Sequence, residues 1–443
     1  MGLYVCGVTV YDDCHVGHVR GAVVFDVLRR VLETLGFQVT HVRNITDLDD
    51  KIIERAREEL KGRSSGDLKA AVQGLARRFE ASFRSDFKEL NLLPPHQEPR
   101  ATEFIDRMIA FIETLLARGA AYVGSDGVYF SVRKIEKFGE LSHQRLEEMR
   151  QGARGEAGEG KQDPMDFALW KRAKPEEPSW ESPWGPGRPG WHIECSTMST
   201  ALLGDAFDIH GGGQDLIFPH HENERSQALG AGKPFARVWL HHGLLTVNGQ
   251  KMSKSLGNIV RISDALSRHP ADVLRLFFLS AHYRSPLDFT WERLQEAAAA
   301  YERLLDFTTQ VEQRVGSGET APAPELDRAR DDFHAALADD LNTPQALAVL
   351  NRLVTLARPW LEQEREAQRQ LRQAARTLRE LVGVLGLRLD QEVPERIRSL
   401  MRQRDELRSQ KQFQAADEIR RKIAQEGYLL EDAAGRTVVR KKA

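Results

Sequence analysis

The N-terminal part of the chain combines two hydrophobic periodicities. Residues 3–10 form an apolar run of strand length, and residues 37–42 form another. Between them, apolar side chains follow the helical i, i+3, i+4, i+7 spacing at Val24, Val27, Leu28, Val31 and Leu35. A strand, a helix and a strand in this order form a βαβ unit, whose crossover makes the two strands parallel. The pattern predicts an α/β fold that begins with a Rossmann-type, doubly wound parallel sheet.

The middle of the chain departs from this pattern. Residues 134–190 lack long periodic helices and include a Gly/Glu-rich stretch at 151–161 and a Pro/Gly/Trp-rich stretch at 174–191. We interpret this segment as an insertion into the sheet domain. Residues 192–240 return to strand and loop signals, and 6 of the 14 histidines fall within residues 192–242.

The last third of the chain is helical in pattern. From about residue 295 the periodicity predicts a helical bundle. A linker is expected at residues 316–324, and Thr343 is expected to cap a helix that begins at Pro344. Pro394 precedes a last basic helix. After this helix, two apolar stretches predict a β-ribbon that closes a small mixed α/β module: residues 428–430 and 437–439.

Composition limits the class of protein only loosely. Of the 443 residues, 41% are hydrophobic, and no apolar run approaches the length of about 18 residues that crosses a bilayer. No basic lead-in or cleavage site precedes Leu3, so we expect no signal peptide and a cytoplasmic location. The net charge of −2 neither supports nor opposes nucleic-acid binding. Three cysteines, Cys6, Cys14 and Cys195, favour a reducing compartment and thiols used for metal or chemistry.

A first chemical motif lies between the first predicted strand and helix. It reads Tyr11-Asp12-Asp13-Cys14-His15-Val16-Gly17-His18. In an open α/β sheet, ligands bind beyond the carboxyl ends of the strands, where a helix N-terminus offers N–H groups to phosphate. His15 and His18 are three residues apart and share a helix face, and Gly17 leaves room for a flat base. The motif alone is also compatible with a simple turn.

A second motif, Lys251-Met252-Ser253-Lys254-Ser255, follows the turn Asn248-Gly249-Gln250. Two lysines three residues apart can neutralise the charge that develops on departing pyrophosphate. Alone, the motif is more typical of a solvated surface loop.

Together, the two motifs are the joint signature of class I aminoacyl-tRNA synthetases. Residues 4–56, 164–224 and 239–258 resemble cysteinyl-tRNA synthetases nearly throughout. The similarity continues more thinly to the C-terminus. The quoted segments that carry it are Asn44-Ile45-Thr46-Asp47, Gly190-Trp191-His192-Ile193-Glu194-Cys195 and Phe218-Pro219-His220-His221-Glu222-Asn223-Glu224.

The resemblance implies a division of the chain into six segments. They are residues 1–115, the first half of the Rossmann catalytic domain; 116–190, a connective insertion; 191–240, the second half of the catalytic domain; 241–294, a stem-contact region with the Lys-Met-Ser-Lys-Ser loop; 295–390, a tRNA-binding helical bundle; and 391–443, an anticodon-binding module.

A metal site is suggested partly by spacing. Pro219 is well placed as the first residue of a helix, from which His220 and Glu224 lie at i and i+4. The residue four after His221 is Arg225, which cannot be a ligand, so spacing favours His220. With thiols from Cys6 and Cys195, both expected beside strands of the sheet, the donor set suits Zn²⁺. Convergence of the four is implied by the resemblance, which matches Cys6, Cys195, His220 and Glu224 to one zinc ion per chain.

The resemblance also implies substrate-binding residues. Catalytic roles fall on His15, His18, Lys251 and Lys254, and ATP with Mg²⁺ is expected at Gly17, His18, Gly212, Asp215 and Lys254. Gly212 and Asp215 belong to a predicted glycine loop, His210-Gly211-Gly212-Gly213-Gln214-Asp215. The substrate L-cysteine is expected near Thr46, Trp191, His192 and His210. Cys14 matches no ligand and is predicted to be a small buried residue.

The C-terminal segment is expected to contact RNA. Residues 402–442 contain 11 Lys/Arg and 7 Asp/Glu, a local excess that a solvated helix face would also explain. Arg408, Phe413 and Asp417 fall where the family's terminal module reads the anticodon, and an aromatic ring beside arginine suits unpaired bases. The expected partners are therefore tRNA(Cys), ATP and L-cysteine, with no membrane, and the expected state is a monomer.

Two other readings stay open at this stage. A paralogous ligase joins cysteine to a glucosamine-inositol with the same type of site, but it generally stops before a terminal anticodon module. The second alternative is a non-catalytic RNA-binding or regulatory relative. It stays open because cysteinyl-tRNA synthetases usually carry a further segment before the strand that here begins at Leu3. All motif residues are present, which favours an active synthetase.

Overall fold

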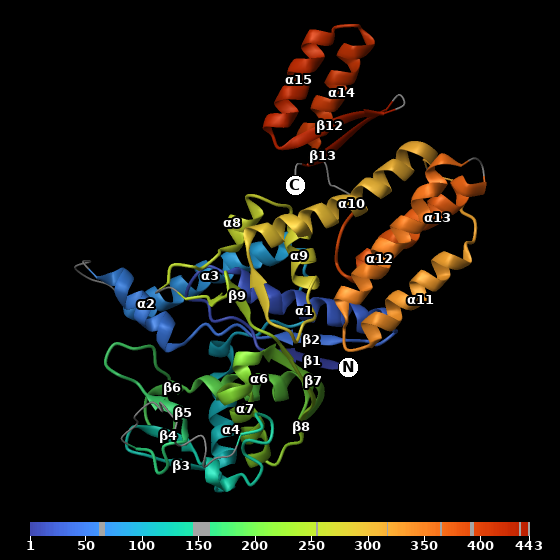
Figure 1. Cartoon of the computed structure of the whole chain (residues 1–443). Helices are drawn as coiled ribbons and strands as arrows, with labels where there is room; N and C mark the ends of the chain where they lie inside the picture. Colours follow the sequence, from blue (N-terminus) through green and yellow to red (C-terminus); the bar gives the residue numbers. More distant parts are fainter. Residues whose placement is uncertain are drawn as a thin grey trace. The chain divides into compact units, whose positions relative to one another are not determined.

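The computed structural model describes residues 1–61, 67–144, 160–253, 256–316, 318–363, 366–389, 394–433 and 436–441. The chain forms two compact units. The first comprises Met1–Phe25, Leu32–Lys88 and Leu93–Leu244, and the second comprises Asp26–Val31, Glu89–Leu92 and Leu245–Ala443. The elements are labelled in Figure 1.

The elements that lie wholly or largely in the first unit are β1 (Gly2–Val5), α1 (Val16–Thr34), β2 (Thr40–Arg43), α2 (Asp50–Leu60), α3 (Leu68–Glu89), η1 (Ala101–Phe104), α4 (Ile105–Ala117), β3 (Ala121–Val123), β4 (Gly127–Phe130), η2 (Val132–Lys134), β5 (Phe167–Arg172), β6 (Gly187–Pro189), α6 (Trp191–Leu203), β7 (Ala206–Gly213), η3 (Gln214–Leu216), η4 (Ile217–His221), α7 (Glu222–Gly230) and β8 (Phe235–His242).

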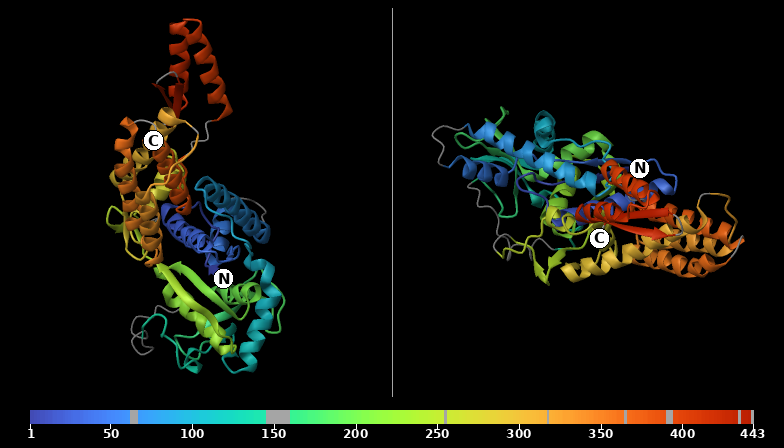
Figure 2. Two further views of the ribbon diagram at one scale, coloured as in Figure 1. Left: turned by 90° about the vertical axis from the view of Figure 1, so that its right-hand side faces the viewer. Right: turned by 90° about the horizontal axis from the view of Figure 1, so that it is seen from above.

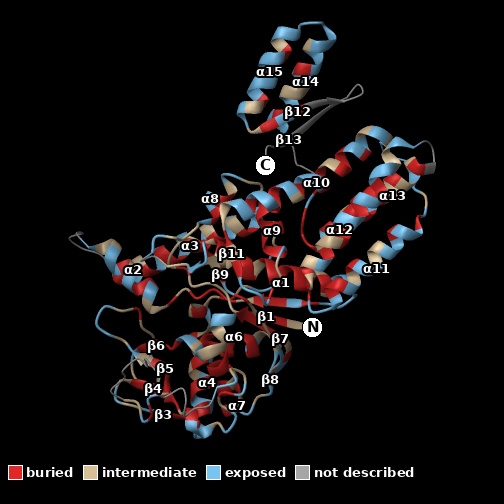
Figure 3. Ribbon diagram, viewed as in Figure 1, coloured by how far each residue is buried: buried red, intermediate tan, exposed pale blue. Residues whose placement is uncertain are grey.

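The predicted parallel sheet is confirmed. Its strands lie in the order β2-β1-β7-β8, and all three neighbouring pairs are parallel. The first βαβ unit is β1-α1-β2, in which Tyr4 lies opposite Val42, and β1 ends at Val5, well before residue 10. Tyr4 and Val42 are fully buried, as Figure 3 shows for much of these strands. Parallel strands end at one edge, so Cys6, Asn44 and Asp215 follow three strands at the same edge.

Helix α6 contradicts the strand and loop signals expected after residue 192. It runs from Trp191 to Leu203, so Cys195 lies within a helix and not in a strand-like segment. All residues from Ile193 to Thr200 are buried, so no polar face alternates with an apolar one. A helix covered on all sides lacks the 3.6-residue periodicity by which helices are recognised. This buried helix packs on β1, β2 and β7.

The predicted insertion contains a small antiparallel sheet, in the order β3-β4-β5-β6. Its inner side joins the core of the first unit through Val128, Phe130, Leu169 and Trp170. Of the Gly/Glu-rich stretch, residues 151–159 lie outside the described part of the chain.

The elements of the second unit, besides its share of α1 and α3, are β9 (Leu245–Val247), β10 (Gln250–Lys251), α8 (Ile262–Leu266), α9 (Ala271–Leu279), β11 (Leu287–Phe289), α10 (Trp291–Val315), α11 (Pro324–Ala338), α12 (Thr343–Ala357), η5 (Arg358–Glu362), α13 (Glu366–Val384), α14 (Glu395–Ser409), α15 (Phe413–Gln425), β12 (Tyr428–Ala433) and β13 (Arg436–Lys441).

Helices α10 to α13 pack against one another as the predicted bundle, which can be followed in Figure 2. The linker before α11 is where it was expected, and Pro324 is the first residue of α11. The cap of α12 was predicted one residue too late. Asn342 accepts a hydrogen bond from the Gln345 N–H and is the cap, whereas the Thr343 hydroxyl donates to the Leu279 carbonyl.

The C-terminal module differs from the prediction in its helices. The expected single basic helix is two helices, α14 and α15, that pack together. The turn between them includes Lys411 with a positive φ of 58°. The predicted β-ribbon is confirmed as the antiparallel pair β12 and β13. Within the described residues, no helix has the length and apolar character needed to cross a membrane.

Candidate active site and metal centre

The structure brings Cys6, Cys195, His220 and Glu224 together. Cys6 follows β1, Cys195 lies in α6, and the other two lie on the helical turns that lead into α7. The Cys6 and Cys195 sulfurs are 3.7 Å apart, and the Cys6 Sγ is 3.5 Å from Glu224 Oε1. His220 Nε2 lies 3.1 Å from the same oxygen. One donor atom of each residue lies within 4.8 Å of the others, so the four could hold one metal ion.

The i, i+4 relation of His220 and Glu224 has the local cause that was predicted. Phe218 has an extended backbone (φ −133°, ψ 131°), and helical backbone continues from Pro219 into α7. His220 and Glu224 therefore face the same direction, one turn apart.

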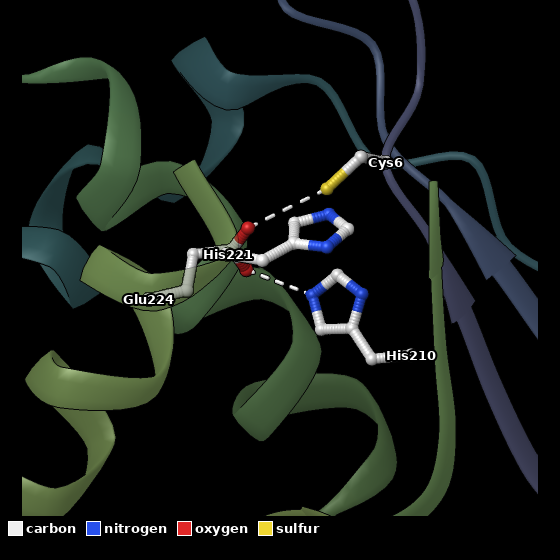
Figure 4. A group of neighbouring side chains, drawn as sticks. All are labelled: Cys6, His210, His221 and Glu224. Atoms are coloured by element: carbon white, nitrogen blue, oxygen red, sulfur yellow. Dashed lines mark hydrogen bonds and ion pairs between the residues drawn. The ribbon is translucent and has the colours of Figure 1, made fainter. Parts of the chain in front are cut away.

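A second group of possible ligands shares two of these residues. One ligand atom each of Cys6, His210, His221 and Glu224 also lies within 4.8 Å of the others. Figure 4 shows these four side chains grouped together. His210 Nε2 is 2.9 Å from Glu224 Oε2. His221 was set aside on its spacing in the sequence, yet its ring lies among these possible ligands. His221 Nδ1 is already 2.7 Å from His241 Nε2, whereas the first group alone contains both thiols.

Burial sets the electrostatics of the cluster. It raises the pKa of the Cys6 thiol well above its usual value. Hydrogen bonding to Cys6 lowers the pKa of Cys195, but burial and the nearby Glu224 carboxyl leave it raised. Burial also lowers the pKa of His220 and of His221 well below their usual value. Without a metal, the imidazoles and the two adjacent thiols are neutral. When a cation binds, the thiols lose their protons and become negatively charged ligands.

The residues predicted near the substrate side chain border this cluster. The Trp191 ring lies 4.2 Å from the His220 ring between centroids, and 40% of Trp191 is exposed. His192 Nδ1 is 2.9 Å from His220 Nδ1. The Thr46 hydroxyl donates to buried Glu194 at 3.1 Å. His210 reaches the cluster through Glu224. Trp191, His192 and His210 thus each contact a residue of the cluster, whereas Thr46 bonds to Glu194 beside Cys195.

Sequence reasoning missed two residues of this network. Asn44 Oδ1 accepts from the Gly7 N–H at 2.8 Å, and its Nδ2 donates to Thr46 Oγ1 at 3.2 Å. The Cys195 sulfur lies 3.7 Å from the same Asn44 oxygen. Burial raises the pKa of Glu194 well above its usual value. Both residues occur in the quoted segments, but the sequence could not show that they bond to Thr46.

The predicted glycine loop is wrong in its secondary structure. His210 to Gly213 are the last residues of β7, and only Gln214 onward leaves the strand. A Cβ on Gly211 would lie 2.1 Å from the Phe25 ring, and one on Gly212 would lie 2.8 Å from His221. Neighbouring side chains therefore require these glycines, which is a known reason for glycine inside a strand. Asp215 is exposed just beyond the strand.

The first motif places its histidines at the N-terminus of α1. The His15 and His18 rings stack with centroids 3.7 Å apart. His15 Nδ1 accepts from the Gly17 N–H at 3.2 Å, and His18 Nδ1 accepts from the His15 N–H at 3.4 Å. These bonds put the protons of neutral rings on Nε2. Burial, with His15 adding to it, lowers the pKa of His18 to about 3, so His18 is a neutral donor.

The second motif lies only partly in the described residues. Lys251 ends β10 and is exposed, and Lys254 lies outside the described residues. The turn before it uses Asn248 and Gly249, both with positive φ, as a two-residue hairpin turn requires. Asn258 ties the loop by accepting from the Ser253 N–H and donating to the Lys251 carbonyl.

The three predicted anticodon residues are all exposed. Arg408 lies in the last turn of α14, Phe413 begins α15, and Asp417 follows Phe413 by one turn. Phe413 is 59% exposed, which is unusual for a large apolar side chain. Cys14 is 4% exposed and belongs to neither group of possible metal ligands.

Comparisons with known proteins identify the family of the chain. Residues 1–299 match the family of class I (C) tRNA synthetase catalytic domains, and residues 332–390 match the DALR domain. The cysteine–tRNA ligase of Alkalilimnicola ehrlichii is 48% identical over 99% of this chain and 95% of its own length. That of Thioalkalivibrio sulfidiphilus is 49% identical, with the same two coverages. The chain belongs to the cysteine–tRNA ligase family. It is thus a class I aminoacyl-tRNA synthetase by its family, as the motifs predicted.

Solved structures of other synthetases share the fold. Methionyl-tRNA synthetase of Mycobacterium tuberculosis, in complex with methionyl-adenylate, superposes with a TM-score of 0.61 at 17% identity, over 87% of this chain and 90% of its own. A putative arginyl-tRNA synthetase of Campylobacter jejuni gives a TM-score of 0.62 at 12% identity, over 88% and 94%. The ligase fold described here is therefore that of class I synthetases.

Proposed function

We propose that this ligase attaches L-cysteine to tRNA(Cys) in two steps. The cysteine carboxylate attacks the α-phosphate of Mg²⁺-bound ATP, which forms cysteinyl-adenylate and releases pyrophosphate. The 2′-hydroxyl of the terminal tRNA adenosine then takes the cysteinyl group and releases AMP. The observation that carries the amino-acid assignment is the cluster of two thiols, an imidazole and a carboxylate at the edge of the sheet where the parallel strands end.

Zn²⁺ fits this cluster by donor chemistry. Cys6, Cys195, His220 and Glu224 offer two sulfurs, a nitrogen and an oxygen, a set typical of zinc. A bound zinc ion would favour a sulfur ligand from the substrate over the hydroxyl of serine. The selectivity then needs no editing site, unlike discrimination by one methylene, which gives about 1–3 kcal/mol.

The remaining residues of the site position the substrates. Thr46, Trp191, His192 and His210 are proposed to surround the cysteine, since each lies in or beside the cluster's contacts. Trp191, being partly exposed, would cover the cysteine from the solvent side.

ATP is assigned to the glycine and histidine positions. Gly17, His18, Gly212 and Asp215 are proposed to contact it, with Asp215 accepting from ribose hydroxyls. The Nε2–H group of His18 can donate to the α-phosphate without adding a full charge, and His15 is proposed to donate beside it. Lys251 and Lys254 are proposed to neutralise the leaving pyrophosphate. Catalysis by such groups rests on positioning and charge stabilisation.

The tRNA is proposed to extend to the second unit. The six-segment division of the chain stands as part of this proposal, with the helices α10–α13 as a tRNA-binding bundle and α14–α15 as the anticodon reader. Exposed Arg408, Phe413 and Asp417 carry the reading of the anticodon. A monomeric state and a cytoplasmic location complete the proposal.

Three assays separate this function from its alternatives. Cysteine-dependent exchange of pyrophosphate into ATP tests adenylate formation, and a folded, metal-loaded sample without exchange would contradict it. Radiolabelled cysteine is then offered with tRNA or with glucosamine-inositol in separate reactions. Transfer to tRNA is expected, and transfer to the amino sugar alone would overturn the assignment. Serine in place of cysteine should give little exchange.

A further inference from the structure

One buried side chain beside the metal cluster has no assigned role. Tyr4 lies in the middle of β1, two residues before Cys6, and its side chain is fully buried. Its ring meets the His210 ring edge-on with centroids 5.1 Å apart and lies 6.5 Å from the Phe207 ring. An apolar phenylalanine would fill the same space, so packing alone does not require the hydroxyl.

The Tyr4 hydroxyl oxygen meets no hydrogen-bond partner of good geometry among the described residues. Burying a hydroxyl without a partner costs free energy, so such a group calls for an explanation. Cys195, Cys6 and Glu224 act on this hydroxyl electrostatically, and among these three Cys195 is the side chain within hydrogen-bonding reach of it.

The proposed metal site would need hydrogen-bond donors. Two thiolates and a carboxylate carry three negative charges against the two positive charges of a zinc ion, and a substrate thiolate would add a fourth. All the ligands except Cys6 are at most 1% exposed, so water cannot stabilise this excess. His210 Nε2 already lies within hydrogen-bond distance of the Glu224 carboxylate. Cys195 has a carbonyl oxygen of Asn44 nearby, which accepts hydrogen bonds and cannot donate to a thiolate.

We propose that Tyr4 is a positioning residue of the metal centre, whose hydroxyl donates a hydrogen bond to the Cys195 thiolate once a divalent metal is bound. The bond would stabilise the charged sulfur and orient it, as hydrogen bonds to metal ligands do in other sites. This inference rests on the proposed metal-binding function. It assigns a purpose to a hydroxyl that is unpartnered without the metal.

The test compares Tyr4→Phe with the wild-type protein and with Tyr129→Phe. Tyr129 is also buried, at 5% exposure, but its hydroxyl donates to Asp126 in the antiparallel sheet. The metal-free proteins are titrated with Co²⁺, which reports thiolate ligation by its charge-transfer absorption, and zinc affinity is measured by competition with a chelator. Tyr4→Phe should weaken metal affinity by about 10- to 100-fold and shift the absorption band. Tyr129→Phe should change neither.

A merely structural role gives a different result. Because the hydroxyl is unpartnered in the metal-free protein, Tyr4→Phe should leave the urea midpoint of that form unchanged or slightly raised. In a Cys195→Ser background, the same substitution should have a much smaller effect on Co²⁺ affinity, since its partner sulfur is gone.

The possible failures can be told apart. Wild-type protein that binds no Co²⁺ through thiolates would overturn the proposed metal site itself. Normal wild-type binding, together with an unchanged affinity and spectrum in Tyr4→Phe, would overturn the role of Tyr4 alone. If Tyr4→Phe lowered the Co²⁺ affinity as much in the Cys195→Ser background as in the wild-type protein, the role of Tyr4 would also be overturned.

Discussion

A buried ion pair in the second unit predicts a large loss of stability when its acid is neutralised. Arg275 on α9 is 0% exposed and Asp26 on α1 is 4% exposed. Besides its bond to the Asp26 carboxylate, Arg275 donates to the Leu385 carbonyl at 2.6 Å and to the Leu90 carbonyl at 3.2 Å. Burial lowers the pKa of Arg275, and Asp26 opposes that shift. Asp26 is therefore the charge that balances a fully buried guanidinium.

The substitution Asp26→Asn removes this charge and keeps the shape of the side chain. Breaking a buried pair by removing one partner costs about 3–5 kcal/mol, because the other charge stays buried. The two carbonyls that bind Arg275 remain, and the asparagine oxygen can still accept a hydrogen bond. We therefore expect the lower end of that range, about 3 kcal/mol.

The assay is equilibrium urea unfolding of the full chain, followed by tryptophan fluorescence and circular dichroism. Coincident transitions from the two probes justify a single free energy of unfolding. The matched control is Glu319→Gln, whose ion pair with Arg369 is exposed on both sides, 79% and 56%. That variant should lose less than about 1 kcal/mol. Equal, small losses in both variants would refute the reasoning from burial.

Four further substitutions test the proposed metal site, the Lys251 loop, the anticodon surface and one helix cap. Cys195→Ser should lower the zinc content and the preference for cysteine over serine; retention of both, by metal analysis and pyrophosphate exchange, would contradict the account of specificity. Lys251→Ala should lower kcat for adenylate formation by about 100- to 1000-fold, as loss of one charge-stabilising donor does, and the KM for cysteine should change little. Phe413→Ala should weaken tRNA binding by about 1–3 kcal/mol, the worth of a stacked base, without changing exchange; an unchanged KM for tRNA would place the anticodon elsewhere. Asn342→Ala should cost about 1 kcal/mol of unfolding free energy as a lost helix cap, measured by urea unfolding, and a loss near zero would contradict its role as the cap.

Several features could be read from local sequence because their causes are local. The strand and helix periodicities at the N-terminus predicted two parallel strands joined by a helix, and the pairing of β1 with β2 confirms this prediction. Pro219 was recognised as the first residue of helical backbone because proline favours that position. The i, i+4 spacing of His220 and Glu224 follows from helix geometry alone. Such features depend on residues a few positions apart, so the sequence contains all the information they need.

Other features were decided only by the tertiary structure. Helix α6 was missed because neighbours cover it on all sides, which erases its periodicity. The glycines of β7 look like a loop until Phe25 and His221 are seen to fill the space of their absent side chains. His221 lies among the possible metal ligands, and Tyr4 lies close enough to the cluster to interact with Cys195. The spacing of residues in the sequence predicts neither contact. Contacts between residues that lie far apart in the chain depend on how the elements pack, and a local pattern does not contain that information.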